Sequence, residues 1–151
     1  MYQTAPLTED LEVTGPVSVQ LWISSSAVDT DFTAKLIDVY PPSDDYPEGY
    51  ALNLTDGILR VKFRNSWERT ELMEPGEVYQ IELSLLPISN LFVKGHRIRL
   101  DISSSNFPRF DVNGNTGENP GISPVKITAL NSVYHDEGRA SHVVLPLVTA
   151  R

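Results

Sequence analysis

The chain has 151 residues, enough for one domain, and its formal net charge is −8 with no cysteine. This acidic balance argues against a nucleic-acid partner, whose phosphates need a basic face, and against an anionic membrane surface. Without cysteine, neither a disulfide framework nor a thiolate zinc site can form.

The N-terminal sequence MYQTAPLTEDLEV lacks the basic and apolar segments of a signal peptide. No apolar run approaches the roughly 18 residues that a membrane-spanning helix needs. Together with the missing cysteines, these features predict a cytoplasmic location. The acidic residues are spread along the chain, which is typical of a solubilising surface.

Strand signals dominate the chain, because eleven prolines and nine glycines interrupt any helical apolar period. The clearest strand is predicted over Pro16–Ser25, where Val17, Val19, Leu21 and Ile23 recur at every second position. A period of two is typical of a half-buried strand. In chain order, further strands are predicted over Phe32–Tyr40, Ile58–Phe63, Val78–Leu86, Arg97–Ser103, Val125–Val133 and His142–Leu147.

Turn signals separate these segments, and Asp56-Gly57, Pro75-Gly76 and Lys94-Gly95 each precede a predicted strand. About eight short strands between Gly, Pro, Asn and Asp loops are typical of a sandwich or jelly roll. We therefore predict an all-β fold, a jelly-roll β-sandwich that forms a single domain over residues 1–151. Two long loops, Pro41–Gly49 and Ser104–Ser123, are expected to be functional or to pack against a neighbour.

A serine hydrolase needs a nucleophile elbow of the form G-x-S-x-G, and the sequence contains none. The serine runs Ser24–Ser26 and Ser103–Ser105 lie at strand ends, where their hydroxyls are expected to satisfy backbone groups. His135 and Asp136 are adjacent, but neighbours on an extended chain point to opposite faces. His96 follows a turn glycine and is assigned to surface or interface packing. We therefore predict no catalytic residue in this chain.

One loop resembles a calcium-binding loop, because Asp111, Asn113 and Asn115 place oxygen atoms at alternate positions. The pattern then fails where Thr116 replaces the required glycine and Ile122 replaces the bidentate glutamate. Plain turn chemistry explains the same residues. We predict no metal site and no other cofactor.

Exposed aromatic residues favour an alternative function, a free-standing module that binds carbohydrate or another ligand. Trp22, Trp67, Tyr46 and Tyr50 are candidate stacking platforms. In a sandwich, such aromatics more often cover a second apolar layer or an interdomain contact.

Basic residues also recur at alternate positions. Arg60, Lys62 and Arg64 are predicted to share one face of a strand, as are Arg97 and Arg99 of another. Exposed cross-strand ion pairs at such positions contribute little each.

Six segments that cover nearly the whole chain carry a family resemblance: Pro6–Val17, Ser25–Pro41, Asp56–Ser66, Glu74–Leu83, Gly95–Gly117 and Tyr134–Leu147. The most distinctive run is GHRIRLDISSSNFPRFDVNGNTG. Together they resemble the C-terminal domain of the X-Pro dipeptidyl-peptidase and cocaine esterase (CocE/NonD) family of hydrolases.

The resemblance implies a jelly roll similar to a galactose-binding fold, attached to an α/β-hydrolase domain with a Ser-Asp-His triad and a helical cap. Such enzymes cleave esters, amides or X-Pro peptide bonds. The chemistry is then expected in sequence before Met1, and this chain is expected to be a non-catalytic accessory domain. Its expected partner is its own catalytic domain, and the isolated chain is expected to form homo-oligomers through the surface left exposed.

The accessory domain is expected to stabilise the catalytic domain and to border the substrate cleft, because ligand sites favour domain interfaces. The long Ser104–Ser123 loop is the candidate contact, and Arg is enriched at interfaces. The residues predicted to make this contact are Asn106, Phe107, Pro108, Arg109 and Phe110.

Overall fold

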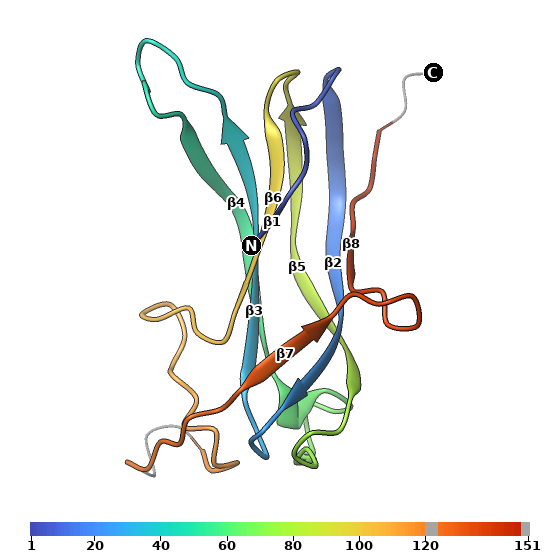
Figure 1. The fold of residues 1–151 in the computed structure, drawn as a ribbon, viewed down its shortest axis with the longest axis vertical. Coiled ribbons are helices and arrows are strands. Elements are labelled where there is room, and N and C mark those ends of the chain that lie inside the picture. Colours follow the sequence, from blue (N-terminus) through green and yellow to red (C-terminus); the bar gives the residue numbers. More distant parts are fainter. Residues whose placement is uncertain (120–123, 149–151) are drawn as a thin grey trace.

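The computed structural model describes residues 1–119 and 124–148, which form two antiparallel sheets packed face to face (Figure 1). One sheet has the strand order β1-β6-β3-β4; in the other, β2 lies between β5 and the short strands β7 and β8. The all-β sandwich is therefore confirmed, and its jelly-roll and galactose-binding-like details stay predictions. The strands are β1 (Tyr2–Gln3), β2 (Leu11–Ser25), β3 (Asp31–Tyr40), β4 (Tyr50–Arg60), β5 (Tyr79–Phe92), β6 (Arg97–Ser103), β7 (Asn131–Tyr134) and β8 (His142–Val144).

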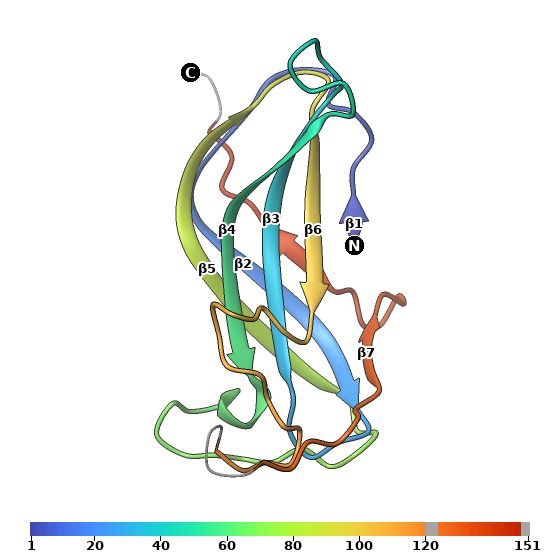
Figure 2. The ribbon, with the colours of Figure 1, turned by 90° about the vertical axis from the view of Figure 1, so that its left-hand side faces the viewer.

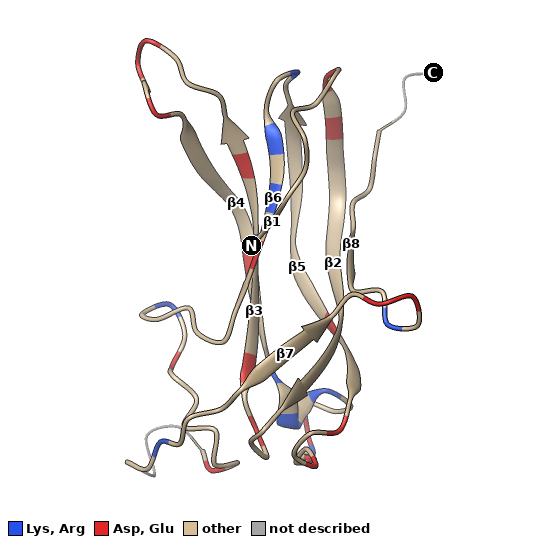
Figure 3. Cartoon of the chain, in the orientation of Figure 1, with Lys and Arg blue, Asp and Glu red and all other residues tan. Residues whose placement is uncertain are grey.

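The only helical element in the described residues is the 3₁₀ turn η1 (Val61–Phe63), which follows β4. No described helix has the length and apolarity needed to cross a bilayer. Acidic residues are distributed from one end of the sandwich to the other (Figure 3), as expected for a solubilising surface.

The two longest strands, β2 and β5, pair along nearly their whole lengths and continue past two prolines. The register shifts between Gly15 and Val17, and Pro16 and Pro87 both lie at this shift. A bulge tolerates proline because the residue there needs no ladder hydrogen bond. The strands therefore extend beyond the predicted Pro16–Ser25 and Val78–Leu86 segments.

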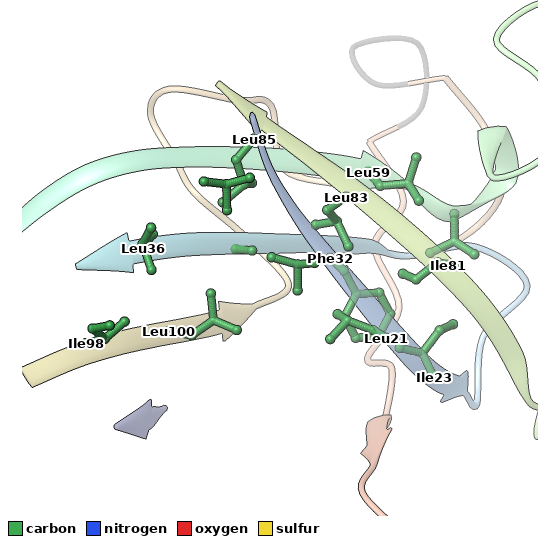
Figure 4. Packing of buried hydrophobic residues seen from close by; sticks show 14 of the residues in the cluster. Leu21, Ile23, Phe32, Leu36, Leu59, Ile81, Leu83, Leu85, Ile98 and Leu100 are labelled. Carbon is green, nitrogen blue, oxygen red and sulfur yellow. The ribbon is translucent and has the colours of Figure 1, made fainter. Parts of the chain in front are cut away.

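The core lies between the sheets and is built from the alternate apolar positions of five strands (Figure 4). Full burial of one such side chain contributes about 1.5–3 kcal/mol. Phe32 and Leu36 of β3 lie at its centre, and neither is more than 2% exposed. The other labelled core residues are Leu21, Ile23, Leu59, Ile81, Leu83, Leu85, Ile98 and Leu100.

One side of the sandwich is closed where β4 lies against β5. The Thr55 hydroxyl donates to the Leu86 carbonyl oxygen at 3.1 Å, and a Cβ built on Gly57 would lie 2.7 Å from Leu85 Cδ2. Asp56-Gly57 is therefore not the predicted turn but the interior of β4. Its glycine provides space for the other sheet rather than a reversal of the chain.

Three predicted strands have different bounds in the structure. The predicted Val125–Val133 strand overlaps the observed β7, Asn131–Tyr134, only at residues 131–133, and β8, His142–Val144, is shorter than the predicted His142–Leu147. The segment 61–63 is a 3₁₀ turn instead of the end of a strand. Lys62 therefore points inward, and Arg60, Lys62 and Arg64 do not share one strand face.

Gly57→Ala should lower the free energy of unfolding by about 1–3 kcal/mol, because a methyl group there overpacks the contact with Leu85. Chemical denaturation of the purified chain measures this change. The matched control is Gly138→Ala, because a Cβ at that position meets only Asp136 Oδ1 at 3.7 Å. Equal stability of the two variants would contradict the steric argument.

Candidate interdomain site

The long loops at one end of the sandwich lie together and form what we call the loop end, residues 64–78, 104–119 and 124–130 (Figures 1 and 2). Ile127 donates its backbone N–H to the Gly114 carbonyl oxygen at 3.0 Å, which joins two of these loops. Leu72 lies against Gly117, where a Cβ would meet its Cδ2 at 2.8 Å, and this contact joins the third. Residues 120–123 of the predicted Ser104–Ser123 loop lie outside the described part of the chain.

A buried carboxylate of β4 holds the predicted contact residues. The Asn106 side-chain amide donates to Asp56 Oδ2 at 2.9 Å, and the Arg109 guanidinium binds Asp56 Oδ1. Asp56 is only 6% exposed, so both contacts tie the loop to the body of the sandwich. Charge-assisted hydrogen bonds of this kind are about twice as strong as neutral ones.

The residues between these two anchors project outward. Phe107 is 71% exposed and Pro108 is exposed beside it. Phe110 is half-buried, with the Arg109 guanidinium 5.4 Å from its ring centroid. The structure thus brings the five predicted residues together as one anchored loop with an apolar tip.

A second anchor of the loop end is Lys62, whose side chain is 1% exposed. Its Nζ donates to the carbonyl oxygens of Gly117 and Glu118 at 2.9 and 3.2 Å, and to Asn119 Oδ1 at 3.3 Å. Asp29 Oδ2 lies 4.0 Å from the same Nζ. Burial of an ammonium requires this degree of compensation. The sequence pattern missed this role, because alternation of basic residues suggested an exposed strand.

The candidate calcium loop is held by hydrogen bonds in which Asn113 is a donor. Its side-chain amide donates to Asp29 Oδ2 at 3.1 Å and to Asp31 Oδ1 at 2.7 Å. Arg60 binds Asp31 in a bidentate pair, at 2.9 and 3.0 Å. Asp31 raises the pKa of Arg60, mainly through this hydrogen bond. In the described residues, no group of three or more His, Cys, Asp and Glu is placed to hold a metal ion.

Burial is the main reason that the pKa of Asp29 lies above its ordinary value. Hydrogen bonds from the Asn113 side chain and the Lys62 backbone N–H oppose this rise, as does the Lys62 charge, while Asp31 adds to it. This carboxylate is therefore retained in the core of the loop end at an electrostatic cost.

The histidines contact groups other than a serine nucleophile. His135 Nε2 lies 2.6 Å from the Tyr2 hydroxyl, while the adjacent Asp136 pairs with Arg139. His96 is buried rather than at the surface, with Nδ1 2.9 Å from Asp38 Oδ1. Because His96 and Asp38 are both buried, we assign this pair a structural role. The turn-like sequence around His96 did not predict its burial.

The serine runs behave as expected of turn hydroxyls. Ser103 Oγ accepts the backbone N–H of Ser105 at 3.1 Å, and Ser26 Oγ accepts that of Leu130 at 2.9 Å. Such local hydrogen bonds are typical of Ser at strand ends and turns.

The candidate aromatic platforms are dispersed. Trp67 is 77% exposed and stacks on Phe63, with ring centroids 6.4 Å apart and an interplanar angle of 21°. Trp22 is half-buried on β2. Tyr46 and Tyr50 pack together at the opposite end, with ring centroids 5.1 Å apart. They therefore do not form one continuous stacking surface.

Asp29→Asn should remove one pH-dependent contribution to stability. Because the folded state raises the pKa of Asp29, the folded chain holds this proton to a higher pH than the unfolded chain does. The free energy of unfolding of the native chain should therefore fall relative to the variant as the pH rises from about 4 towards neutrality. Urea denaturation of both proteins at several pH values measures the difference, and a difference independent of pH would refute the assignment.

Comparison with known proteins identifies relatives of the whole described sandwich. Residues 1–144 match the family described as the X-Pro dipeptidyl-peptidase C-terminal non-catalytic domain. A cocaine esterase from Rhodococcus sp. (strain MB1 Bresler) is 45% identical over 149 residues, which are 97% of this chain and 25% of that protein.

Solved structures of related hydrolases contain the same fold. An aminopeptidase from the marine sediment archaeon Thaumarchaeota archaeon superimposes with a TM-score of 0.91 at 28% identity, over 98% of this chain and 25% of that chain. An α-amino acid ester hydrolase gives a TM-score of 0.91 at 31% identity, over 97% of this chain and 25% of that chain. The chain spans about a quarter of the length of these relatives. It belongs to the family of C-terminal non-catalytic domains of X-Pro dipeptidyl-peptidases and the related CocE/NonD hydrolases.

Proposed function

We propose that this domain docks on the α/β-hydrolase domain of a serine hydrolase through its loop end and there borders the substrate cleft. The observation that carries the proposal is the exposed Phe107 tip on a loop held by the buried Asp56. The domain supplies no nucleophile of its own; its contribution is to stabilise and position the catalytic domain.

The anchoring of the tip favours binding because little conformational freedom remains to be lost. Asn106 and Arg109 fix both sides of the Phe107-Pro108 pair on one carboxylate. A group that is held in place before association binds at a smaller entropic cost. An exposed aromatic beside an arginine is also the composition typical of the energetic centre of an interface.

The surroundings of the tip provide further apolar area. Interfaces between domains of one chain typically bury about 600–1,500 Å², and exposed apolar patches mark such surfaces. The exposed large apolar residues of the loop end are Trp67, Leu72, Phe107, Val112, Val125, Ile127 and Leu130. Removal of the catalytic domain would leave these residues in water, which favours homo-oligomers of the isolated chain.

The reaction of the full-length protein is proposed to be the hydrolysis of an acyl bond. The relatives include a cocaine esterase, an aminopeptidase and an α-amino acid ester hydrolase, so they act on esters or on peptide bonds. Both reactions proceed by attack on a carbonyl carbon. An accessory domain beside the cleft would shape access of the substrate, because binding sites favour domain interfaces.

Phe107→Ala should destabilise the full-length enzyme by about 1–3 kcal/mol through loss of an aromatic interface contact. It should leave the isolated 151-residue chain unchanged, because Phe107 is 71% exposed there. Thermal unfolding and steady-state kinetics of both forms measure these effects.

The matched control for this prediction is Tyr46→Ala, which removes an aromatic ring that is 53% exposed at the opposite end of the sandwich. The control should leave the stability and the kinetics of the full-length enzyme unaltered. If Phe107→Ala leaves both properties of the full-length enzyme unaltered as well, the docking proposal is wrong.

A second candidate function, carbohydrate binding, is supported by the pocket of about 420 Å³ beside Trp67. Glu82, Ser84 and Asn65 line this pocket with polar groups, and an exposed indole is a suitable stacking surface for a sugar ring. Calorimetric titration of the chain with monosaccharides tests it. Binding that is lost in Trp67→Ala and kept in Tyr46→Ala would support this function; absence of heat would exclude it.

A further inference from the structure

The sandwich is closed along β4 and β5 but open along its other side. Figure 2 shows β1 and β6 at this side of their sheet. Residues of β1 and β6, together with β8 of the other sheet, line a pocket of about 310 Å³. The volume is about twice that of an apolar cavity of ~150 Å³ that holds benzene. The pocket reaches the core, since Leu21, only 2% exposed, lies in its wall. The other apolar walls are Ile98, Leu100, Ile102 and Val143.

Three of the polar residues around this pocket, Ser141, Tyr2 and His135, already have hydrogen-bond partners. The Ser141 hydroxyl donates to the Tyr134 carbonyl oxygen at 2.7 Å and accepts the Trp22 backbone N–H at 2.9 Å. The Tyr2 hydroxyl and His135 Nε2 satisfy one another at 2.6 Å. The surface left for an occupant is therefore mainly hydrocarbon, which favours an apolar side chain over a polar ligand.

The strand at the mouth of the pocket is unusually short. β1 pairs only Tyr2 with Leu100 and Gln3 with Arg99, and Thr4 continues the pairing by donating its N–H to the Ile98 carbonyl oxygen at 3.0 Å. In the described residues, no strand pairs with β6 beyond Leu100 on this side. The C-terminal part of β6, after Leu100, is thus an open strand edge beside an apolar pocket.

The register of this pair determines what an extension of β1 would meet. Each step back along β1 is one step forward along β6, so Met1 lies opposite Asp101 and the preceding residue would lie opposite Ile102. Backbone groups alternate in direction along a strand. Because Ile98 bonds to the β1 side, Leu100 and Ile102 direct their N–H and C=O groups to that side too.

The side chains follow the same alternation. Ile98, Leu100 and Ile102 all line the pocket, and directly opposed residues of an antiparallel pair share one face of the sheet. The residue opposite Ile102 would therefore direct its side chain into the pocket.

We infer that, in the full-length enzyme, the polypeptide that precedes Met1 extends β1 along the open edge of β6. The residue opposite Ile102 is apolar and fills the pocket. The family is that of a C-terminal domain, so the catalytic portion of its members precedes it, and the first strand of this chain lies at this edge. The inference rests on the proposed attachment to a catalytic domain, but it concerns a different surface from the loop end.

Hydrogen exchange at single-residue resolution tests the inference, with the full-length enzyme compared with this 151-residue chain. The Ile102 amide should exchange about tenfold or more slowly in the full-length enzyme, because it gains a backbone acceptor. The amides of Arg99 and Asp101 point to β3 and serve as internal controls, so they should be protected in both proteins. Equal exchange of the Ile102 amide in the two proteins would overturn the inference.

A pair of variants on β8 tests the pocket itself. Val143 lines the pocket, whereas the adjacent Val144 is 48% exposed and points to the other face. In the full-length enzyme, Val143→Ala should speed exchange of the Ile102 amide, and Val144→Ala should leave it unchanged. Identical exchange in both variants would show that nothing packs into the pocket.

These measurements separate the two proposals. Loss of the expected Phe107→Ala effect with retained protection at Ile102 would remove the loop-end proposal alone. Retention of the Phe107→Ala effect with an unprotected Ile102 amide would remove the strand extension alone.

Discussion

The close approach of β4 to β5 at Gly57 is the constraint on which the other features of the sandwich depend. A Cβ at this position would lie 2.7 Å from Leu85 Cδ2, so glycine lets the two sheets meet along this side without displacing Leu85. Once one side is closed, the twist of the sheets separates them on the other. The apolar pocket between β6 and β8 is the result. Asp56 is next to Gly57 in β4, and its buried carboxylate binds Asn106 and Arg109 of the loop that carries Phe107.

Several charged groups at the loop end are buried. Lys62, Asp29 and Asp31 are each almost fully buried, and each is compensated by hydrogen bonds or an opposite charge. Replacement of such groups by hydrocarbon is often neutral or stabilising, so their value lies in the geometry that they impose. Here that geometry fixes residues 113–119 against the body of the sandwich. A rigid loop end is what an accessory domain needs to hold a catalytic partner in one orientation.

The family is that of a non-catalytic domain. Two surfaces of this domain are candidates for contact with the rest of the enzyme. The loop end offers an anchored aromatic tip and exposed apolar residues, while the open side offers an unpaired strand edge and a pocket. Docking on the first surface and strand extension on the second are compatible, because they lie on different parts of the sandwich (Figures 1 and 2). A domain attached at two separate places cannot rotate freely about its connection, which suits a module at the border of a cleft.

The sequence alone determined the fold class and the membership of the family. Alternating apolar residues in β2, β5 and β6 were visible as period-two patterns, because each strand buries one face and exposes the other. The prediction of the 106–110 contact rested on loop length instead, since long loops without secondary structure are often functional or pack against a neighbour. The proposed contact, the jelly-roll detail and the cytoplasmic location stay predictions from sequence.

Only the tertiary structure decided the features that depend on residues far apart in the chain. Asp56-Gly57 has the local chemistry of a turn, and its place inside β4 follows from Leu85 in the other sheet. Lys62 has the pattern of an exposed strand, and its burial follows from acceptors some 55 residues later, at Gly117 and beyond. The pocket arises from the separation of two sheets. Local patterns record which face of a strand is buried, but they do not record how closely two sheets approach one another.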